Sequence, residues 1–145
     1  MLETLNVTKT IDARSDAVWT AIAAIGGLDR WFSVIEDCRV EGAGAGAKRF
    51  LHLAGGGEIE DRVEDIDHQH RRFRYTRTRS PFPVKSYVGV VEAHPVSRDR
   101  SEVSWTVDIE VAPEAKDELV SFLIGALSDG IGGLERDLRQ AAASG

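Results

Sequence analysis

The sequence predicts an α+β fold in which a strongly curved, seven-stranded antiparallel sheet wraps around one long C-terminal helix. Segments with alternating apolar and polar residues follow one another through the middle of the chain, separated by short polar or glycine-rich turns. The long apolar stripe at helical spacing lies at the C-terminal end. Because sheets twist, successive antiparallel strands curl, and only the terminal helix is long enough to cover their apolar concave face. An arrangement of this size often leaves a cavity between sheet and helix.

The clearest strand covers residues 102–111. Its odd-numbered residues, from Val103 to Val111, are apolar, whereas its even-numbered residues are polar, which is typical of a sheet with one buried and one wet face. Residues 57–67 repeat this pattern. The other strands are expected at residues 5–11, 36–42, 47–54, 71–78 and 86–94.

Two short helices are expected between the first and second strands, at residues 15–25, with Ser15 as a candidate N-cap, and at residues 28–35. The long helix is expected to begin at Pro113 and to continue past residue 138. Its apolar stripe consists of Leu119, Leu123, Leu127, Leu134 and Leu138. Residues 1–145 are therefore predicted to form one domain, with the last few residues disordered.

Composition excludes several classes of protein. The net charge of −6 argues against non-specific nucleic-acid binding, and the single cysteine excludes an intramolecular disulfide. The apolar runs are too short to span a membrane, and no signal peptide is visible. We therefore expect a cytoplasmic protein that does not insert stably into membranes.

The stretch "EGAGAGAKRF", residues 41–50, resembles a phosphate-binding loop at first sight. Such a loop follows a strand and opens a helix, whereas this one leads into another strand, and no lysine–serine or lysine–threonine pair follows. The run "AGGGE", residues 54–58, also joins two strands. Both runs are predicted to be hairpin turns, and the second is a candidate for a mobile rim of the cavity.

The ordered set of segments resembles the helix-grip proteins of the START and birch-pollen-allergen superfamily (SRPBCC). It is most similar to their bacterial polyketide cyclase/dehydrase and lipid-transport family. The segments that carry the resemblance are "IDARSDAVWTAI", "LDRWFSVIEDCRVEGAGAGAKRFLHL", "GGEIEDRVEDID", "RRFRYTRTRSPFPVKSYVGVVEAHPV" and "EVSWTV". The resemblance implies a cavity for a small hydrophobic ligand such as a lipid, a polyketide or an aromatic metabolite. It does not identify that ligand.

Asp61 is the most informative candidate residue. Alternation places it on the apolar face of its strand, where an unpaired carboxylate is costly, and the resembling family often carries a glutamate there. If Val63 pairs with Phe73, then Asp61 pairs with Tyr75, and Arg77 becomes its diagonal neighbour and partner. The pair is either a polar anchor for a ligand or a structural ion pair that closes one end of the cavity.

The other candidates for the cavity are aromatic or apolar. Tyr75 and Tyr87 could add hydroxyl groups, although core packing is the slightly favoured interpretation. Trp105 is expected in the core or the cavity wall, and Trp31 or Phe32 at the mouth. The candidate lining is completed by Phe50, Leu123, Leu127 and Gly130.

Glycine is unusual inside a helix, and residues 128–134 contain three. Each exposed glycine costs about 1 kcal/mol relative to alanine. The possible reasons are close approach to the sheet, a kink or space for a ligand, and we favour space for a ligand or a bend over the cavity at Gly130 and its neighbours. The loop "SPFPVKSY", residues 80–87, is expected near the entrance, where its prolines stiffen the connection.

The four histidines do not converge in the predicted fold, so neither a metal nor a cofactor is expected. The favoured function is therefore binding or transport of a small hydrophobic molecule. The alternative is a cyclase or dehydratase with Asp61 as general acid or base and Tyr75 or Arg77 polarising a carbonyl, although Arg77 would lower the pKa of Asp61. A protein-interaction domain has the least support. The sequence leaves the oligomeric state open, with a homodimer as one candidate.

Overall fold

The structure is a computed structural model that describes residues 1–144. Within these residues seven strands form one antiparallel sheet in the order β1-β7-β6-β5-β4-β3-β2, which confirms the predicted fold class. The strands are β1 (Leu2–Ile11), β2 (Ile35–Glu41), β3 (Lys48–Leu53), β4 (Glu58–Asp67), β5 (Arg72–Arg79), β6 (Val84–Ser97) and β7 (Arg100–Val111). The helices are α1 (Ser15–Ala23), α2 (Leu28–Trp31) and α3 (Pro113–Ser144).

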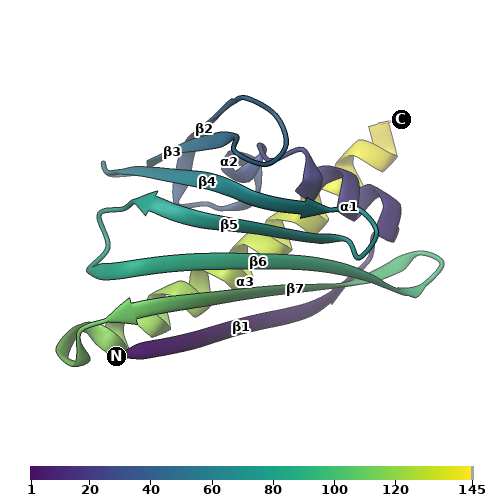
Figure 1. Cartoon of the computed structure of the whole chain (residues 1–145). Coiled ribbons are helices and arrows are strands. Elements are labelled where there is room, and N and C mark those ends of the chain that lie inside the picture. Colours follow the sequence, from purple (N-terminus) through teal and green to yellow (C-terminus); the bar gives the residue numbers. More distant parts are fainter. Residues whose placement is uncertain (145) are drawn as a thin grey trace.

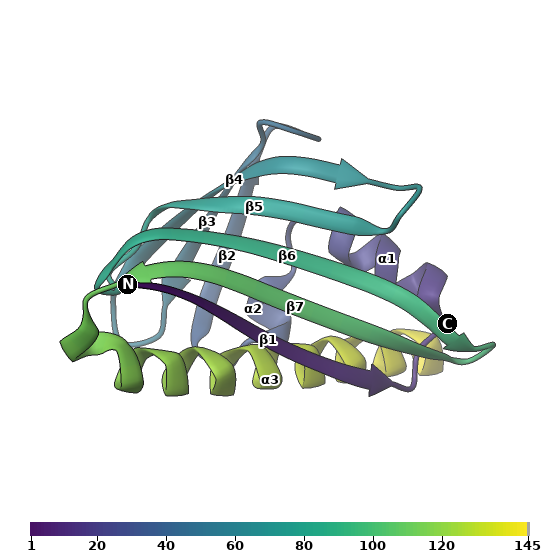
Figure 2. The same ribbon diagram turned by 60° about the horizontal axis from the view of Figure 1, so that its bottom comes forward.

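The sheet is bent around α3. Figure 1 shows α3 crossing behind the sheet, and Figure 2 shows the long strands arched over it. The helices α1 and α2 connect β1 to β2, and these two strands form the two edges of the sheet. No helix within residues 1–144 is long and apolar enough to cross a membrane.

The core lies between the concave face of the sheet and α3. Alternation in β7 is confirmed, because the odd-numbered residues from Val103 to Val111 are buried while the even-numbered residues between them are not. The stripe on α3 is buried from Leu119 to Leu134, and Leu138 packs against its edge. Each buried aliphatic side chain of this kind contributes about 1.5–3 kcal/mol to folding, so this shared face holds helix and sheet together.

Both short helices are shorter than expected. The helix α2 ends at Trp31 because the backbone of Phe32 is already extended. Ser15 does not cap α1: its hydroxyl instead accepts a hydrogen bond of 2.7 Å from Nη1 of Arg71. The last few residues were expected to be disordered. The structure describes α3 as helical to Ser144, and Gly145 lies outside the described residues.

The register between β4 and β5 differs from the sequence-based expectation. Asp61 lies directly opposite Arg77, and Val63 lies opposite Tyr75, because the hairpin turn occupies residues 68–71 and β4 carries a bulge between Val63 and Asp65. The turn is longer than expected since Arg71 adopts a φ of 51° and Asp67 Oδ1 accepts the backbone N–H of His70. Asp61 and Arg77 are therefore direct rather than diagonal neighbours.

The two glycine runs are hairpin turns, as predicted. The first joins β2 to β3 with Gly42 at a φ of 86°, and the second joins β3 to β4 with Gly56 at a φ of 103°. A side chain is strained in this left-handed region, so glycine is required. That the second turn forms a mobile rim stays a prediction.

Candidate functional site

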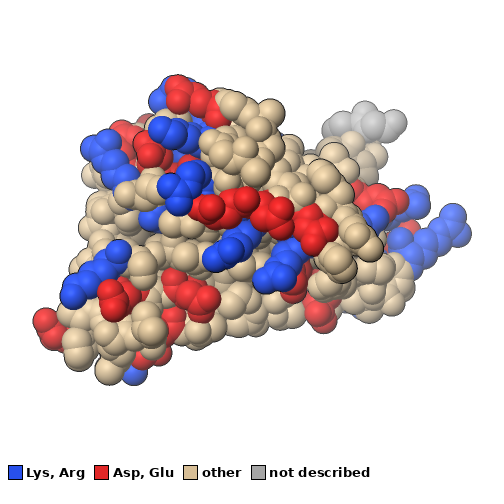
Figure 3. Space-filling model, in the orientation of Figure 1, with Lys and Arg blue, Asp and Glu red and all other residues tan. Residues whose placement is uncertain are grey.

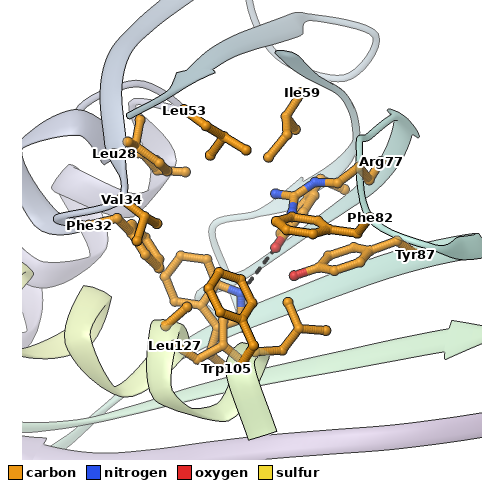
Figure 4. Close-up of a pocket in the computed structure, with 15 residues that line it drawn as sticks. Leu28, Phe32, Val34, Leu53, Ile59, Arg77, Phe82, Tyr87, Trp105 and Leu127 are labelled. Carbon is orange, nitrogen blue, oxygen red and sulfur yellow. Dashed lines mark hydrogen bonds between the residues drawn. The ribbon is translucent and has the colours of Figure 1, made fainter. Parts of the chain in front are cut away.

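A pocket lies between the concave face of the sheet and the middle of α3, next to α2 and the loop between β5 and β6 (Figure 4). Seven of the predicted residues line it: Phe32, Tyr75, Arg77, Tyr87, Trp105, Leu123 and Leu127. Further lining residues, which were not expected from the sequence, include Leu28, Leu53, Ile59 and Phe122. The cavity volume is about 40 Å³. Small-molecule sites have volumes of roughly 300–1,000 Å³, so a ligand must widen this pocket in order to enter.

Beside the pocket, Asp61 is held between two arginines. Arg49 on β3, Asp61 on β4 and Arg77 on β5 lie directly opposite one another in register, which brings the three side chains together. Arg49 donates to Oδ2 of Asp61 from Nη2 at 2.9 Å and from Nε at 3.1 Å. Arg77 donates from Nε to Oδ1 at 2.8 Å. The predicted pairing of Asp61 with Arg77 is thus confirmed.

Arg49 is the member of this cluster that sequence reasoning missed. Its side chain is only 3% exposed, and its Nη1 donates to the backbone carbonyl of Ile25 at 2.9 Å. A signal was present, because Arg49, Leu51 and Leu53 alternate on one face of β3 and all three are buried. An inward-facing arginine next to an inward-facing aspartate indicates a buried ion pair.

The electrostatics of the cluster favour its charged form. Burial raises the pKa of Asp61, but the guanidinium groups of Arg77 and Arg49 outweigh burial and hold this pKa below its ordinary value. Burial opposes the charge of Arg77 as well, and the carboxylate of Asp61 nevertheless raises the pKa of Arg77. Asp61 is 0% exposed and does not line the pocket, whereas Arg77 does. Arg77 is therefore the charged group that a ligand would meet.

Aromatic rings surround the guanidinium group of Arg77. The guanidinium carbon of Arg77 lies 4.2 Å from the ring centre of Tyr87 and 5.8 Å from that of Tyr75. The Nε1 of Trp105 donates to the hydroxyl of Tyr75 at 3.1 Å, the bond drawn in Figure 4. Gly89 on β6 provides the space, because a Cβ there would lie 2.2 Å from Cζ of Tyr75. The pocket thus has a polar end built from Arg77, Tyr75 and Tyr87.

Two phenylalanines lie at the boundary of the pocket. Phe82, in the loop between β5 and β6, and Phe122 on α3 have ring centres 5.5 Å apart. Both rings line the pocket and also an adjoining surface groove, so they separate the two. Phe32, which the sequence suggested for the mouth, instead forms part of the inner wall, edge-on to Trp105 with 5.3 Å between ring centres.

Besides Asp61, three of the predicted site residues do not line the pocket. The indole of Trp31 is buried outside the pocket, where its Nε1 donates to Asp137 on α3 at 3.1 Å. Phe50 points to the opposite face of the sheet, where the guanidinium of Arg39 lies 4.4 Å from its ring centre. Gly130 does not line the pocket; it accommodates the ring of Phe32, because a Cβ there would lie 2.2 Å from Cζ of that ring.

Outside the pocket, charged side chains of both signs are interspersed over the face of the sheet seen in Figure 3. Arg72 of β5 pairs there with Glu92 of β6 at 3.6 Å. Among residues 1–144, no three histidine, cysteine, aspartate or glutamate side chains come together in a way that could hold a metal ion.

Comparisons with known proteins agree with this architecture. A family model described as "Polyketide cyclase / dehydrase and lipid transport" matches residues 3–139. The NMR structure of a protein from Thermobifida fusca is 26% identical, with a TM-score of 0.81 over 94% of this chain and 93% of that chain. No sequence among the curated proteins matches this chain.

Two enzymes share the fold at lower identity. The Zhui aromatase/cyclase from Streptomyces sp. R1128 is 19% identical, with a TM-score of 0.85 over 98% of this chain and 96% of that chain. Norcoclaurine synthase from Thalictrum flavum, in complex with dopamine and hydroxybenzaldehyde, is 17% identical, with a TM-score of 0.76 over 97% of this chain and 88% of that chain. At these identities the likeness shows a common fold.

Proposed function

The chain belongs to the polyketide cyclase/dehydrase and lipid transport family, and we propose that it binds a small hydrophobic or amphipathic molecule between its sheet and α3. The observation that carries this proposal is an apolar pocket with a single polar end, at Arg77 and Tyr87. Pockets with apolar walls and a few convergent polar groups are typical of small-molecule sites. A lipid, a polyketide or an aromatic metabolite would satisfy this arrangement.

Catalysis by Asp61 as a general acid or base has weaker support. The carboxylate does not line the pocket, and both of its oxygens accept hydrogen bonds from guanidinium groups. Because its pKa lies below the ordinary value, Asp61 is ionised at neutral pH and is a poor proton acceptor. The two enzymes that share the fold do not change this argument, since one fold hosts many chemistries.

Native mass spectrometry of the protein purified from its own host tests the proposal. We expect a complex heavier than the chain by the mass of one small molecule, and the extra mass should disappear when the protein is denatured. Extraction and mass analysis would then identify the molecule. Turnover of that compound by the protein would favour the enzyme alternative, whereas unchanged compound would favour a binding protein.

Removing the ring of Phe122 should open the entrance. Phe122→Ala removes one of the two rings of the Phe82–Phe122 pair. Because Phe122 is 43% exposed, this substitution should lower the free energy of unfolding only slightly. We expect association of the neutral fluorescent probe N-phenyl-1-naphthylamine to become several-fold faster in stopped-flow measurements, because less of the gate has to move. Ile124→Ala is the matched control, since Ile124 is equally exposed on α3 and does not line the pocket. Equal association rates in the two variants would contradict an entrance at Phe122.

A further inference from the structure

Resting on the proposed binding function, we infer that the natural ligand is a hydrophobic monocarboxylate whose carboxylate is bound by Arg77. A general apolar site would not specify a charge or a chemical group at one end of its ligand. Three features specify both here: the charge of the buried cluster, the hydrogen-bonding groups that the cluster leaves unused, and the apolar character of the other walls.

The buried cluster carries an excess positive charge. Two guanidinium groups share one carboxylate, and the side chains of Arg49, Asp61 and Arg77 are 3%, 0% and 8% exposed. Arginine stays protonated in proteins. Within residues 1–144, Asp61 is the only carboxylate paired with either guanidinium. The neighbouring Tyr87 does not supply a second negative charge, because burial raises its pKa far above neutral pH.

Hydrogen bonding identifies Arg77 as the group with unused capacity. Each of the three guanidinium nitrogens of Arg49 donates a hydrogen bond, with Nε and Nη2 on Asp61 and Nη1 on the carbonyl of Ile25. Arg77 contacts Asp61 through Nε and Nη2, and within the described part of the chain its Nη1 makes no hydrogen bond. Arg77 also lines the pocket, and Figure 4 shows its guanidinium directed inward on the same side as the hydroxyl of Tyr87.

A carboxylate fits this end better than a neutral oxygen. An uncompensated charge in a low-dielectric interior is unfavourable. A bound anion compensates the excess positive charge of the cluster, whereas a carbonyl or hydroxyl group does not. Hydrogen bonds between guanidinium and carboxylate are roughly twice as strong as neutral ones. One excess charge matches a monoanion; a dianion would reverse the imbalance.

The remaining walls determine the body of the ligand. Away from Arg77 the largest side chains are the rings of Phe32, Trp105, Phe82 and Phe122, together with aliphatic residues of α3. These walls offer dispersion contacts and no second charge. A flat or flexible apolar body with its carboxylate at one end therefore matches the pocket.

Calorimetric titration with three isosteric probes tests the inference at neutral pH: 2-naphthoate, 2-naphthamide and 2-naphthylmethanol. The wild-type protein should bind the acid at least about tenfold more tightly than the amide or the alcohol, a difference of about 1.4 kcal/mol. In Arg77→Gln the preference for the acid should disappear while affinity for the amide stays within a few-fold. Arg74→Gln is the matched control, because Arg74 lies on the same strand with an exposed side chain, and this variant should keep the preference.

Different failures have different meanings. Equal binding of all three probes by the wild-type protein, or a preference for the acid that persists in Arg77→Gln, would overturn the carboxylate inference and leave the binding function intact. Absence of binding by every probe, in the wild-type protein and in Phe122→Ala, would count against the binding function itself and would remove the basis of the inference.

The wild-type protein alone supplies a second measurement that does not require Arg77→Gln to fold. Carbon NMR of carboxyl-labelled 2-naphthoate follows the titration of the ligand itself. Pairing with a guanidinium should lower the pKa of the bound acid relative to the free acid. An unchanged or raised pKa would show that the carboxylate is not paired with Arg77 and would overturn the inference.

Discussion

Asp61→Asn is expected to lower the free energy of unfolding by about 3–5 kcal/mol, the range measured when one partner of a buried ion pair is removed. The carboxylate of Asp61 is the group that compensates Arg49 and Arg77, and without it two buried guanidinium groups face each other across β4. Urea denaturation measures the change. Asp65→Asn is the matched control on the same strand, where the side chain is exposed, and it should alter stability by no more than about 0.5 kcal/mol.

A second substitution separates this mechanism from general damage to β4. If the loss arises from guanidinium groups without a partner, Arg49→Met in the Asp61→Asn background should restore part of the stability, because only Arg77 then lacks its carboxylate. The double variant should therefore be more stable than the sum of the single effects predicts. Strict additivity, or a loss below about 1 kcal/mol in Asp61→Asn, would contradict a stabilising role for the cluster.

The pH dependence of stability gives an independent check. The pKa of Asp61 in the folded protein lies below its ordinary value of 3.8. Its contribution is therefore fully present above that ordinary value and is lost as the pH falls through the lower pKa of the folded state. The difference in stability between the wild-type protein and Asp61→Asn should be largest near neutral pH and should shrink in acid. A difference that stays constant down to pH values well below 3.8 would contradict the lowered pKa.

Most of the fold could be predicted because each strand carries its own signal. Alternation in β7 and β4 is local information, and it placed Asp61 on the inner face without knowledge of its partner. Register is different, since it depends on the length of the turn at residues 68–71 and on the bulge after Val63. Neither feature has a reliable sequence signature. The pairing of Asp61 with Arg77 was therefore predicted while its geometry was not.

The site residues that lie outside the pocket have two different origins. Phe50 was expected in the cavity, although alternation within β3, which is a local signal, turns it outward. Trp31 packs against α3, and Gly130 of α3 contacts Phe32 directly after α2, so both depend on how a four-residue helix packs against α3. Such packing becomes visible only when the elements are placed in space.

The glycines of α3 provide a test in which two substitutions of the same type should have opposite effects. By helix propensity alone, Gly→Ala stabilises a helix by about 1 kcal/mol. At Gly125 this gain should be realised, because the residue is exposed and a Cβ there has nothing within 4 Å. At Gly133 a Cβ would lie 1.9 Å from the backbone carbonyl oxygen of Trp31, so α2 and α3 would have to separate.

We therefore expect Gly125→Ala to raise the free energy of unfolding by about 0.5–1 kcal/mol and Gly133→Ala to lower it by about 3 kcal/mol or more, the upper end of overpacking effects. Gly130→Ala should lie between them, because its neighbour is the ring of Phe32 and a side chain can move where a backbone cannot. That movement would push Phe32 toward the pocket, so Gly130→Ala should also weaken binding of N-phenyl-1-naphthylamine, whereas Gly125→Ala should not. Urea denaturation and probe titration of the three variants measure both effects. If Gly133→Ala proved as stable as Gly125→Ala, α2 would not be packed against α3 at this distance in solution. The position of Phe32 in the pocket wall, which depends on that packing, would then also be wrong.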